Sequence, residues 1–116
     1  MSSDLEAAFD TWLKRLAPKV PAPAHEYRFT TMRKWRFDRA WIDQRVAVEL
    51  EGAVYTNGRH TRGKGYEADC EKYNTAVAHT WRVFRFTAGM LERDPLLCIS
   101  QVVIALGYDP LEVLPK

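Results

Sequence analysis

Three acidic residues, Asp38, Glu49 and Glu51, lie in the segment Trp35 to Gly52, which has the pattern of a tight β-hairpin. If the turn is centred on positions 43 and 44, Asp38 lies directly opposite Glu49. Opposed residues in an antiparallel pair have Cβ atoms about 5 Å apart, and like charges there are destabilising unless something neutralises them. Side chains alternate along a strand, so Glu51 shares the face of Glu49. The hairpin therefore predicts three carboxylates at one place, where a cation could bind.

A structural cluster, in which Arg36 or Arg45 neutralises the carboxylates, is the alternative interpretation. Exposed strands also often carry acidic residues, and 15 of the 116 residues are Asp or Glu. The surrounding strands are strongly apolar, however, and the face opposite Asp38 is expected to carry the aromatic residues Trp35, Phe37 and Trp41. Carboxylates that are partly covered need a partner, because an unpaired buried charge is costly. This neighbourhood favours a metal site.

The residues before the hairpin predict one helix and one strand. The helix runs from about Asp4 to Leu16, with Ser2 or Ser3 as its cap, acidic residues in its first turn and basic residues in its last. Prolines at positions 18, 21 and 23 then end the helix and impose an extended connector. A short strand is expected near Glu26 to Thr30.

The residues after the hairpin predict a loop, Thr56 to Gly65, and then a helix from Tyr66 to about His79, whose apolar residues recur at helical spacing. Trp81 to Phe86 reads as a strand, and a last helix is expected from Asp94 to Gly107. A helix between two strands suggests a crossover with partly parallel pairing. The order helix, three strands, helix, strand, helix predicts an α/β fold with a mixed sheet of about four strands flanked by helices.

The length of 116 residues predicts a single domain over 1–116, and the net charge of +2 does not by itself indicate a nucleic-acid-binding protein. Cys70 and Cys98 fall on the apolar sides of predicted helices, so both are expected to be reduced and buried, as in a cytosolic protein. No apolar run approaches the roughly 20 residues that span a bilayer. Nothing at the N-terminus resembles a targeting peptide, and a cytoplasmic location is expected.

The acidic segment carries a family likeness. Phe37-Asp38, ten intervening residues and then Glu49-Leu50-Glu51, followed by a helix and a strand, resemble the PD-(D/E)XK nuclease superfamily with its restriction-endonuclease-like core. Three stretches resemble, more narrowly, the small very-short-patch-repair-like endonucleases of bacteria and phages: Val46 to Gly52, Asp69 with Lys72, and Trp81 to Phe86. The likeness covers about Asp38 to Phe86, with Leu5-Glu6 as a weaker extension. No Pro precedes Asp38, and Glu51 replaces the usual Lys.

The resemblance implies a metal-dependent DNA endonuclease that uses Mg²⁺, with Mn²⁺ able to substitute. Asp38, Glu49 and the Leu50 carbonyl would hold the ion, and carboxylate oxygens are the ligands that such ions prefer. Glu51 would position or deprotonate the attacking water, or bind a second ion. Lys72 would offset phosphate charge, although it could equally be a solvated helix lysine.

Two further residues were considered for catalysis. Glu6 would orient a metal-bound water from the first helix, with a solvated first-turn carboxylate as the alternative. His60 could act as a general acid or base, because an unperturbed imidazole titrates near pH 6.5, or it could contact a phosphate.

Basic residues gather on both sides of the hairpin and are expected to draw a phosphate backbone toward the carboxylates. One cluster interleaves with aromatic residues, and the other lies in the predicted loop together with His60. Such contacts position a backbone and carry no sequence code, so we expect selectivity for branched, nicked or mismatched DNA. The residues are Arg28, Arg33, Lys34, Arg36 and Arg39 in the first cluster, and Arg59, Arg62 and Lys64 in the second.

Two other functions remain open at this stage. One is a non-catalytic nucleic-acid-binding subunit that keeps the nuclease fold, and the other is an unrelated α/β domain with a structural cluster. A homodimer through the last helix is expected, because a nuclease of this size rarely makes both cuts of a duplex alone. A bacterial or phage role in DNA repair or recombination follows from the resemblance.

Overall fold

The computed structural model describes residues 4–52 and 58–115, leaving aside the side chains of residues 58–62 and 64. The predicted order of helices and strands is confirmed, and two short helices, α3 and α5, are added to it. In chain order the described elements are α1 (Asp4–Leu16), β1 (Ala24–Arg28), β2 (Arg36–Trp41), β3 (Val46–Glu51), α2 (Gly58–Ala78), β4 (Arg82–Thr87), α3 (Ala88–Arg93), α4 (Pro95–Ala105) and α5 (Pro110–Val113).

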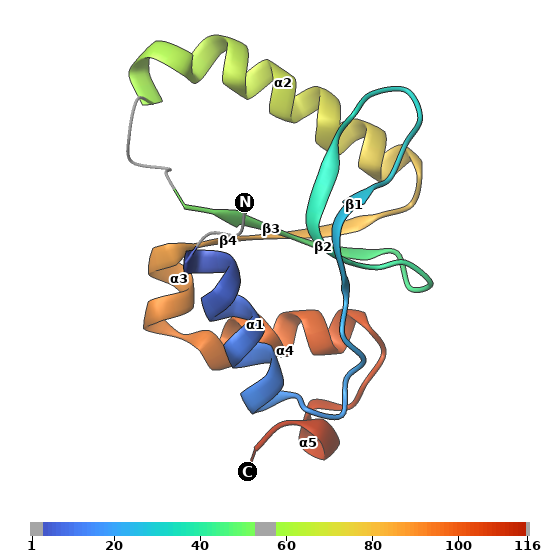
Figure 1. Cartoon of the computed structure of the whole chain (residues 1–116), viewed down its shortest axis with the longest axis vertical. Coiled ribbons are helices and arrows are strands. Elements are labelled where there is room, and N and C mark those ends of the chain that lie inside the picture. Colours follow the sequence, from blue (N-terminus) through green and yellow to red (C-terminus); the bar gives the residue numbers. More distant parts are fainter. Residues whose placement is uncertain (1–3, 53–57, 116) are drawn as a thin grey trace.

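The four strands form one mixed sheet in the order β1-β2-β3-β4. The first three strands are antiparallel, and β4 lies parallel to β3. The crossover between β3 and β4 contains α2, which lies on one face of the sheet, while α1 and α4 lie on the other (Figure 1). The predicted α/β class with a mixed four-stranded sheet is therefore confirmed.

The turn between β2 and β3 fixes the register of the acidic hairpin. Arg45 adopts a φ of 55°, and its amide donates to the Ile42 carbonyl at 3.2 Å. Trp41 then pairs with Val46, followed by Ala40 with Ala47 and Arg39 with Val48. These three pairs follow the predicted register, and the pairing of Asp38 with Glu49 stays a prediction, because the paired residues of β2 and β3 end at Arg39 and Val48.

Two apolar clusters hold the helices on the sheet. The larger one lies under α1 and α4 and includes Phe9, Trp41 and Val48, while the smaller one includes Phe37 and Ala76 and lies under α2. Phe37 and Trp41 were expected on one face, and this prediction is wrong. Strict alternation fails because the start of β2 follows the β1–β2 connection toward α2 (Figure 1), where the Phe37 ring stacks on Phe29 at 4.1 Å.

Helix α2 differs from its prediction in length and in orientation. It begins at Gly58, so the predicted loop is wrong from that residue onward. Tyr66, Cys70 and Val77 are exposed rather than buried, and the buried residue is Ala76. The small Ala76 side chain allows the helix to approach the Phe37 and Trp81 rings, and this contact decides which face of α2 is covered.

The C-terminal helices begin and end as their capping residues dictate. The Asp94 carboxylate accepts a hydrogen bond from the Leu97 amide at 3.0 Å, as predicted for a helix start before Pro95. Gly107 adopts a φ of 93°, a conformation that favours glycine, and it ends the helix. Cys98 is buried in α4 as expected. Among the described residues, no helix combines the length and apolar character needed to cross a membrane.

Candidate functional site

Two of the predicted acidic residues, Glu49 and Glu51, lie with Lys72 and Asp69 on the α2 face of the sheet. Glu49 and Glu51 extend from the end of β3, and Lys72 reaches down from α2. The Lys72 Nζ lies 2.6 Å from Glu49 Oε1, and both side chains are largely buried, with exposed fractions of 16% and 11%. Lys72 is therefore not the solvated helix lysine that the alternative interpretation assumed.

Arg85, a residue that the sequence analysis did not select, pairs with Glu51. Its Nε donates to Glu51 Oε1 at 2.7 Å, and its second terminal nitrogen lies 3.3 Å from Asp69 Oδ2. The guanidinium stands 4.4 Å from the centre of the Tyr73 ring, which also carries the Lys72 ammonium at 5.5 Å. In the parallel register of β3 and β4, Arg85 pairs with Glu49, and Thr87 pairs with Glu51. This register could have revealed Arg85 as a neighbour of the acidic residues.

Asp38 completes the group from β2. Its Oδ2 accepts a hydrogen bond from the Leu50 amide at 2.7 Å, which ties the two strands together where the acids lie. Burial raises the pKa of Glu49 to about 7, Lys72 opposes the increase, and the charges of Asp38 and Glu51 add to it. The negative charges of Asp38 and Glu51 thus act on Glu49, while Lys72 and Arg85 offset part of the acidic charge.

The salt bridges test the alternative interpretation, in which Arg36 or Arg45 neutralises the carboxylates of a structural cluster. Lys72 and Arg85 neutralise part of the acidic charge, whereas the expected partners do not. Arg45 donates to the His79 carbonyl at 2.9 Å, and Arg36 forms no ion pair among the described residues.

A second cluster of charges lies on the α1 face. Arg39 is only 1% exposed and binds Glu6 at 3.0 Å and Asp10 at 2.8 Å through its terminal nitrogens. Its Nε also donates to Asp10 at 2.9 Å, so the pairing with Asp10 is bidentate. Arg39 was expected to attract phosphate, and the alternative interpretation of Glu6 was a solvated carboxylate. Both expectations are wrong. The helix α1 brings two carboxylates over β2, and this contact buries the arginine.

Glu6 also belongs to a carboxylate group that the sequence analysis missed in part. One oxygen from each of Glu6, Glu26 and Asp38 lies within 4.8 Å of the others, a spacing compatible with a shared cation. The β1–β2 register sets Glu26 opposite Asp38, between the pairs Tyr27 with Phe37 and His25 with Arg39. The argument from opposed like charges applies to this pair too, but it required a register that only the structure supplies.

The residues present fit a hard divalent cation. The donors are carboxylate oxygens only, and Asp38 belongs to both acidic groups. No hydrogen bond between described residues uses Asp38 Oδ1 or Glu49 Oε2, so each side chain keeps one oxygen for a ligand. The pKa of Glu49 is raised mainly by burial and further by the charges of Asp38 and Glu51, and a bound cation would favour the charged form of this carboxylate. Leu50 contacts Asp38 through its amide, and its carbonyl as a ligand stays a prediction.

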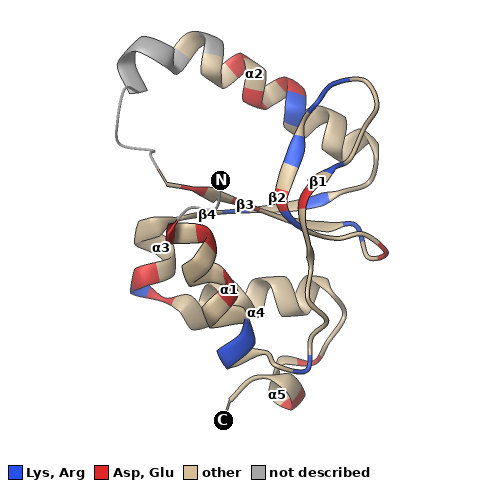
Figure 2. Ribbon diagram, viewed as in Figure 1, with Lys and Arg blue, Asp and Glu red and all other residues tan. Residues whose placement is uncertain are grey.

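The first predicted basic cluster lies on the β1–β2 connection. Arg33, Lys34 and Arg36 are exposed there, and Figure 2 shows basic segments of this connection beside α2. Arg28 is occupied in holding the connection, since it donates to the carbonyls of Thr30, Arg33 and Thr31. The side chains of the second cluster, Arg59, His60, Arg62 and Lys64, lie outside the described part of the structure.

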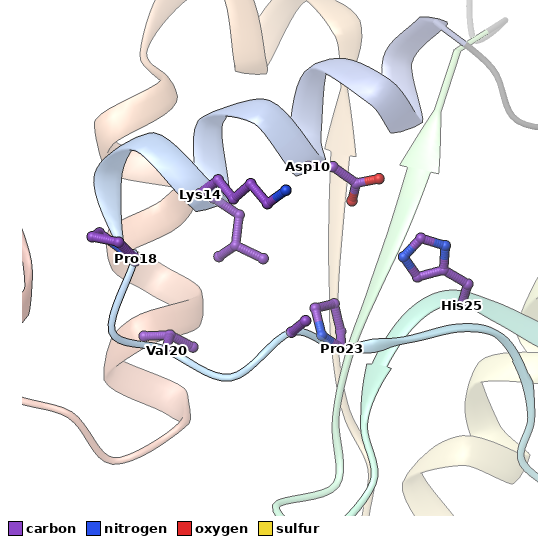
Figure 3. Close-up of a pocket in the computed structure, with 9 residues that line it drawn as sticks. Asp10, Lys14, Pro18, Val20, Pro23 and His25 are labelled. Atoms are coloured by element: carbon purple, nitrogen blue, oxygen red, sulfur yellow. The ribbon is translucent and has the colours of Figure 1, made fainter.

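A cavity of about 280 Å³ opens between α1 and the connector that leads to β1 (Figure 3). Asp10, Lys14 and His25 line it together with apolar residues that include Leu13 and Val20. None of the predicted site residues lines this cavity. Asp10 reaches it while bound to Arg39, which places the cavity beside the Arg39 cluster and away from Lys72.

Comparisons of the chain with models of protein families, with curated proteins and with solved structures found no match.

Proposed function

We propose that this chain is a metal-dependent endonuclease that hydrolyses phosphodiester bonds in DNA. The observation that carries the proposal is the contact between Lys72 and Glu49, beside Asp38 and Glu51. The PD-(D/E)XK pattern expects a lysine where this chain has Glu51. Helix α2 supplies an ammonium at the same carboxylates from another element, so the full set of charges for phosphodiester hydrolysis is present.

Asp38 and Glu49 would hold Mg²⁺ or Mn²⁺, with Leu50 as a backbone ligand. When bound, the ion supplies a Lewis acid that stabilises negative charge and lowers the pKa of water. Lys72 then places a positive charge beside the phosphate under attack, where charge accumulates in the transition state. Glu51 orients the attacking water and accepts its proton, and Glu6 stays a candidate for orienting water from the α1 side.

The exposed cations of the β1–β2 connection would hold the phosphate backbone on the α2 side of the sheet. Arg33, Lys34 and Arg36 supply charge without reading bases, which supports selectivity for the shape of branched, nicked or mismatched DNA. Arg59, His60, Arg62 and Lys64 are proposed to extend this surface. We place the activity in the cytoplasm of a bacterium or of a phage host.

Cleavage assays test the proposal. The protein is incubated with supercoiled, single-stranded and four-way-junction DNA in Mg²⁺, Mn²⁺ or EDTA. Cleavage should require a divalent ion and disappear in Asp38→Ala and in Glu49→Ala. Lys72→Met should lower the cleavage rate by about 100-fold or more, as is typical when one stabilising group is removed. Lys19→Met, an exposed lysine remote from the carboxylates, is the matched control and should cleave normally.

A non-catalytic DNA-binding subunit is the second candidate, and the pairing of Glu51 with Arg85 favours it. In this function the carboxylates would be neutralised permanently by protein cations. Tight junction binding without cleavage in any divalent ion would support it. Loss of folding in Glu49→Ala, measured by circular dichroism, together with no Mn²⁺ binding in calorimetry, would instead indicate a purely structural cluster.

A homodimer remains part of the proposal. Leu96, Leu97 and Ile104 are exposed on α4, the helix expected to form the interface. Light scattering that gives a monomer with and without DNA would contradict it.

A further inference from the structure

We propose that Arg85 is an internal counter-ion, which pairs with Glu51 in the absence of metal and moves to a substrate phosphate when a divalent cation occupies the carboxylates. This inference rests on the proposed function and adds to it a second substrate-binding cation, one that the sequence pattern does not mark. It also explains how Glu51 can be salt-bridged in the structure and still take part in catalysis.

The position of Arg85 allows such a move. The side chain extends from β4 and is 44% exposed, whereas Glu51 is 27% exposed, so the guanidinium forms the solvent side of the pair. Its second contact, with Asp69 of α2, is longer, at 3.3 Å, and Asp69 is itself half exposed. Ion pairs this accessible contribute little to stability, because water compensates both charges. Leaving Glu51 therefore costs the protein little.

The Tyr73 ring keeps Arg85 near the site after the move. The guanidinium lies 4.4 Å from the ring centre, within the range of a cation–π interaction. Tyr73 is partly buried on α2, and its ring also lies against the Lys72 ammonium, 5.5 Å from the ring centre. Arg85 can thus pivot on this ring without losing its place above the carboxylates.

The balance of charges indicates what would release Arg85. The described site holds four carboxylates, Asp38, Glu49, Glu51 and Asp69, and two cations, Lys72 and Arg85. Carboxylates therefore outnumber cations there, and a divalent cation would offset part of the difference. An ion bound at the carboxylates would repel the guanidinium and remove its attraction to Glu51. A phosphate is the partner that an arginine fork then fits best, because both groups can form two parallel hydrogen bonds.

Lys72 differs from Arg85 in a way that assigns the two cations different tasks. Lys72 is only 16% exposed and binds Glu49 at 2.6 Å, beneath the aromatic rings of Phe37 and Tyr73. It is held at the carboxylates, whereas Arg85 reaches solvent. Arg85 is therefore the cation that can meet a phosphate outside the metal position.

Arg85→Gln tests the proposal, and Arg82→Gln is its control. Arg82 lies on the same strand and is exposed, but it donates to the Ala105 carbonyl and pairs with no carboxylate among the described residues. Mn²⁺ affinity is measured by calorimetry without DNA. Affinity for a fluorescent four-way junction is measured by anisotropy with Ca²⁺ and with EDTA over a series of salt concentrations, after a gel has shown that the DNA is uncut.

Arg85→Gln should change the two affinities in opposite directions. Mn²⁺ should bind at least about threefold more tightly, because a competing cation has been removed. In Ca²⁺, the junction should bind about three- to tenfold more weakly, with a salt dependence smaller by about one phosphate contact. In EDTA, junction affinity should match the wild type. Arg85→Lys keeps the charge and should leave Mn²⁺ affinity near the wild-type value while still weakening the junction complex in Ca²⁺.

A merely structural arginine would give another pattern. The inference is wrong if Arg85→Gln lowers the affinity for both Mn²⁺ and the junction, or if its two affinities equal those of Arg82→Gln. The proposed function would then still rest on DNA cleavage by the wild-type protein. If the wild-type protein binds neither Mn²⁺ nor the junction, both the inference and the proposed function are wrong.

Discussion

Two clusters of cations and carboxylates lie on opposite faces of one small sheet, and they differ in how far solvent reaches their cations. On the α1 face, Arg39 is 1% exposed and binds two carboxylates, Asp10 in bidentate geometry and Glu6. On the α2 face, the pKa of Glu49 is raised to about 7 although Lys72 touches it. Carboxylates outnumber cations in both clusters, but the first is built around an arginine that is almost fully enclosed, whereas the second contains Arg85, which is 44% exposed.

The difference separates a structural role from a chemical one. A buried arginine whose donors are paired joins α1 to the sheet and has nothing left to offer a ligand. A partly buried group of acids with excess negative charge has a reason to bind a cation. The presence of acids near a cation therefore does not mark a functional site, whereas acids beside a cation that solvent reaches are candidates for one.

Arg39→Met should have the largest effect on stability. The substitution leaves Glu6 and Asp10 without their buried counter-ion, and breaking a buried pair by removing one partner costs about 3–5 kcal/mol. Urea unfolding followed by circular dichroism measures the free energy of unfolding. Arg36→Met, an exposed arginine on β2 with no ion pair among the described residues, should change it by no more than about 0.5 kcal/mol. A loss of less than about 1 kcal/mol for Arg39→Met would remove the structural role assigned to the α1-face cluster.

The α2-face cluster should show itself in the pH dependence of stability. The folded protein holds the Glu49 proton more tightly than the unfolded chain, since burial raises the pKa from 4.5 to about 7. The contribution of this group is complete below about pH 4.5 and is lost as pH rises to about 7. In EDTA, the free energy of unfolding should fall over this window by about 3 kcal/mol, at 1.36 kcal/mol per pKa unit.

Glu49→Gln removes the titrating group and should remove most of this fall, as measured by urea unfolding at several pH values. Glu92→Gln, an exposed carboxylate on α3, is the matched control and should retain it. An equal fall in Glu49→Gln would show that Glu49 is compensated after all.

Arg85→Gln should change stability little in spite of its two salt bridges. The side chain is 44% exposed, and exposed ion pairs are worth about 0–1 kcal/mol, so the expected loss lies in this range. Thermal unfolding at pH 7 in EDTA provides the measurement. A loss comparable with that of Arg39→Met would mean that the two faces do not differ as described.

The basic β1–β2 connection should have the smallest effect on stability and a clear effect on DNA. Replacing Arg33, Lys34 and Arg36 together by Gln leaves the Arg28 contacts that hold the connection in place. The free energy of unfolding should change by about 0.5 kcal/mol or less. If each residue contacts one phosphate, the logarithmic salt slope of DNA binding should fall by about 0.9 for each of the three. An unchanged slope would place the DNA elsewhere.

Much of the fold could be predicted because the signals were local. Helix α1 spans Asp4–Leu16 as its charge pattern predicts, its predicted caps Ser2 and Ser3 lie outside the described residues, and Asp94 starts α4 as an N-cap residue. The short helices α3 and α5 were missed, since six and four residues carry little periodic signal. The face of α2 was wrong because its apolar spacing, from Tyr66 to Val77, does not coincide with the small residue, Ala76, that permits contact with the sheet.

The candidate site likewise combines features that local sequence signals predict with features that they do not. The sequence by itself determined the register of the hairpin next to its turn, from Trp41 with Val46 to Arg39 with Val48, because a short turn leaves few alternatives. Only the tertiary structure decided which cations form ion pairs with these acids. The parallel crossover brings Lys72 of α2 and Arg85 of β4 to the acids, whereas Arg39 pairs with Asp10 of α1 on the other face. Charge pairing depends on distances across the chain, which local spacing does not encode.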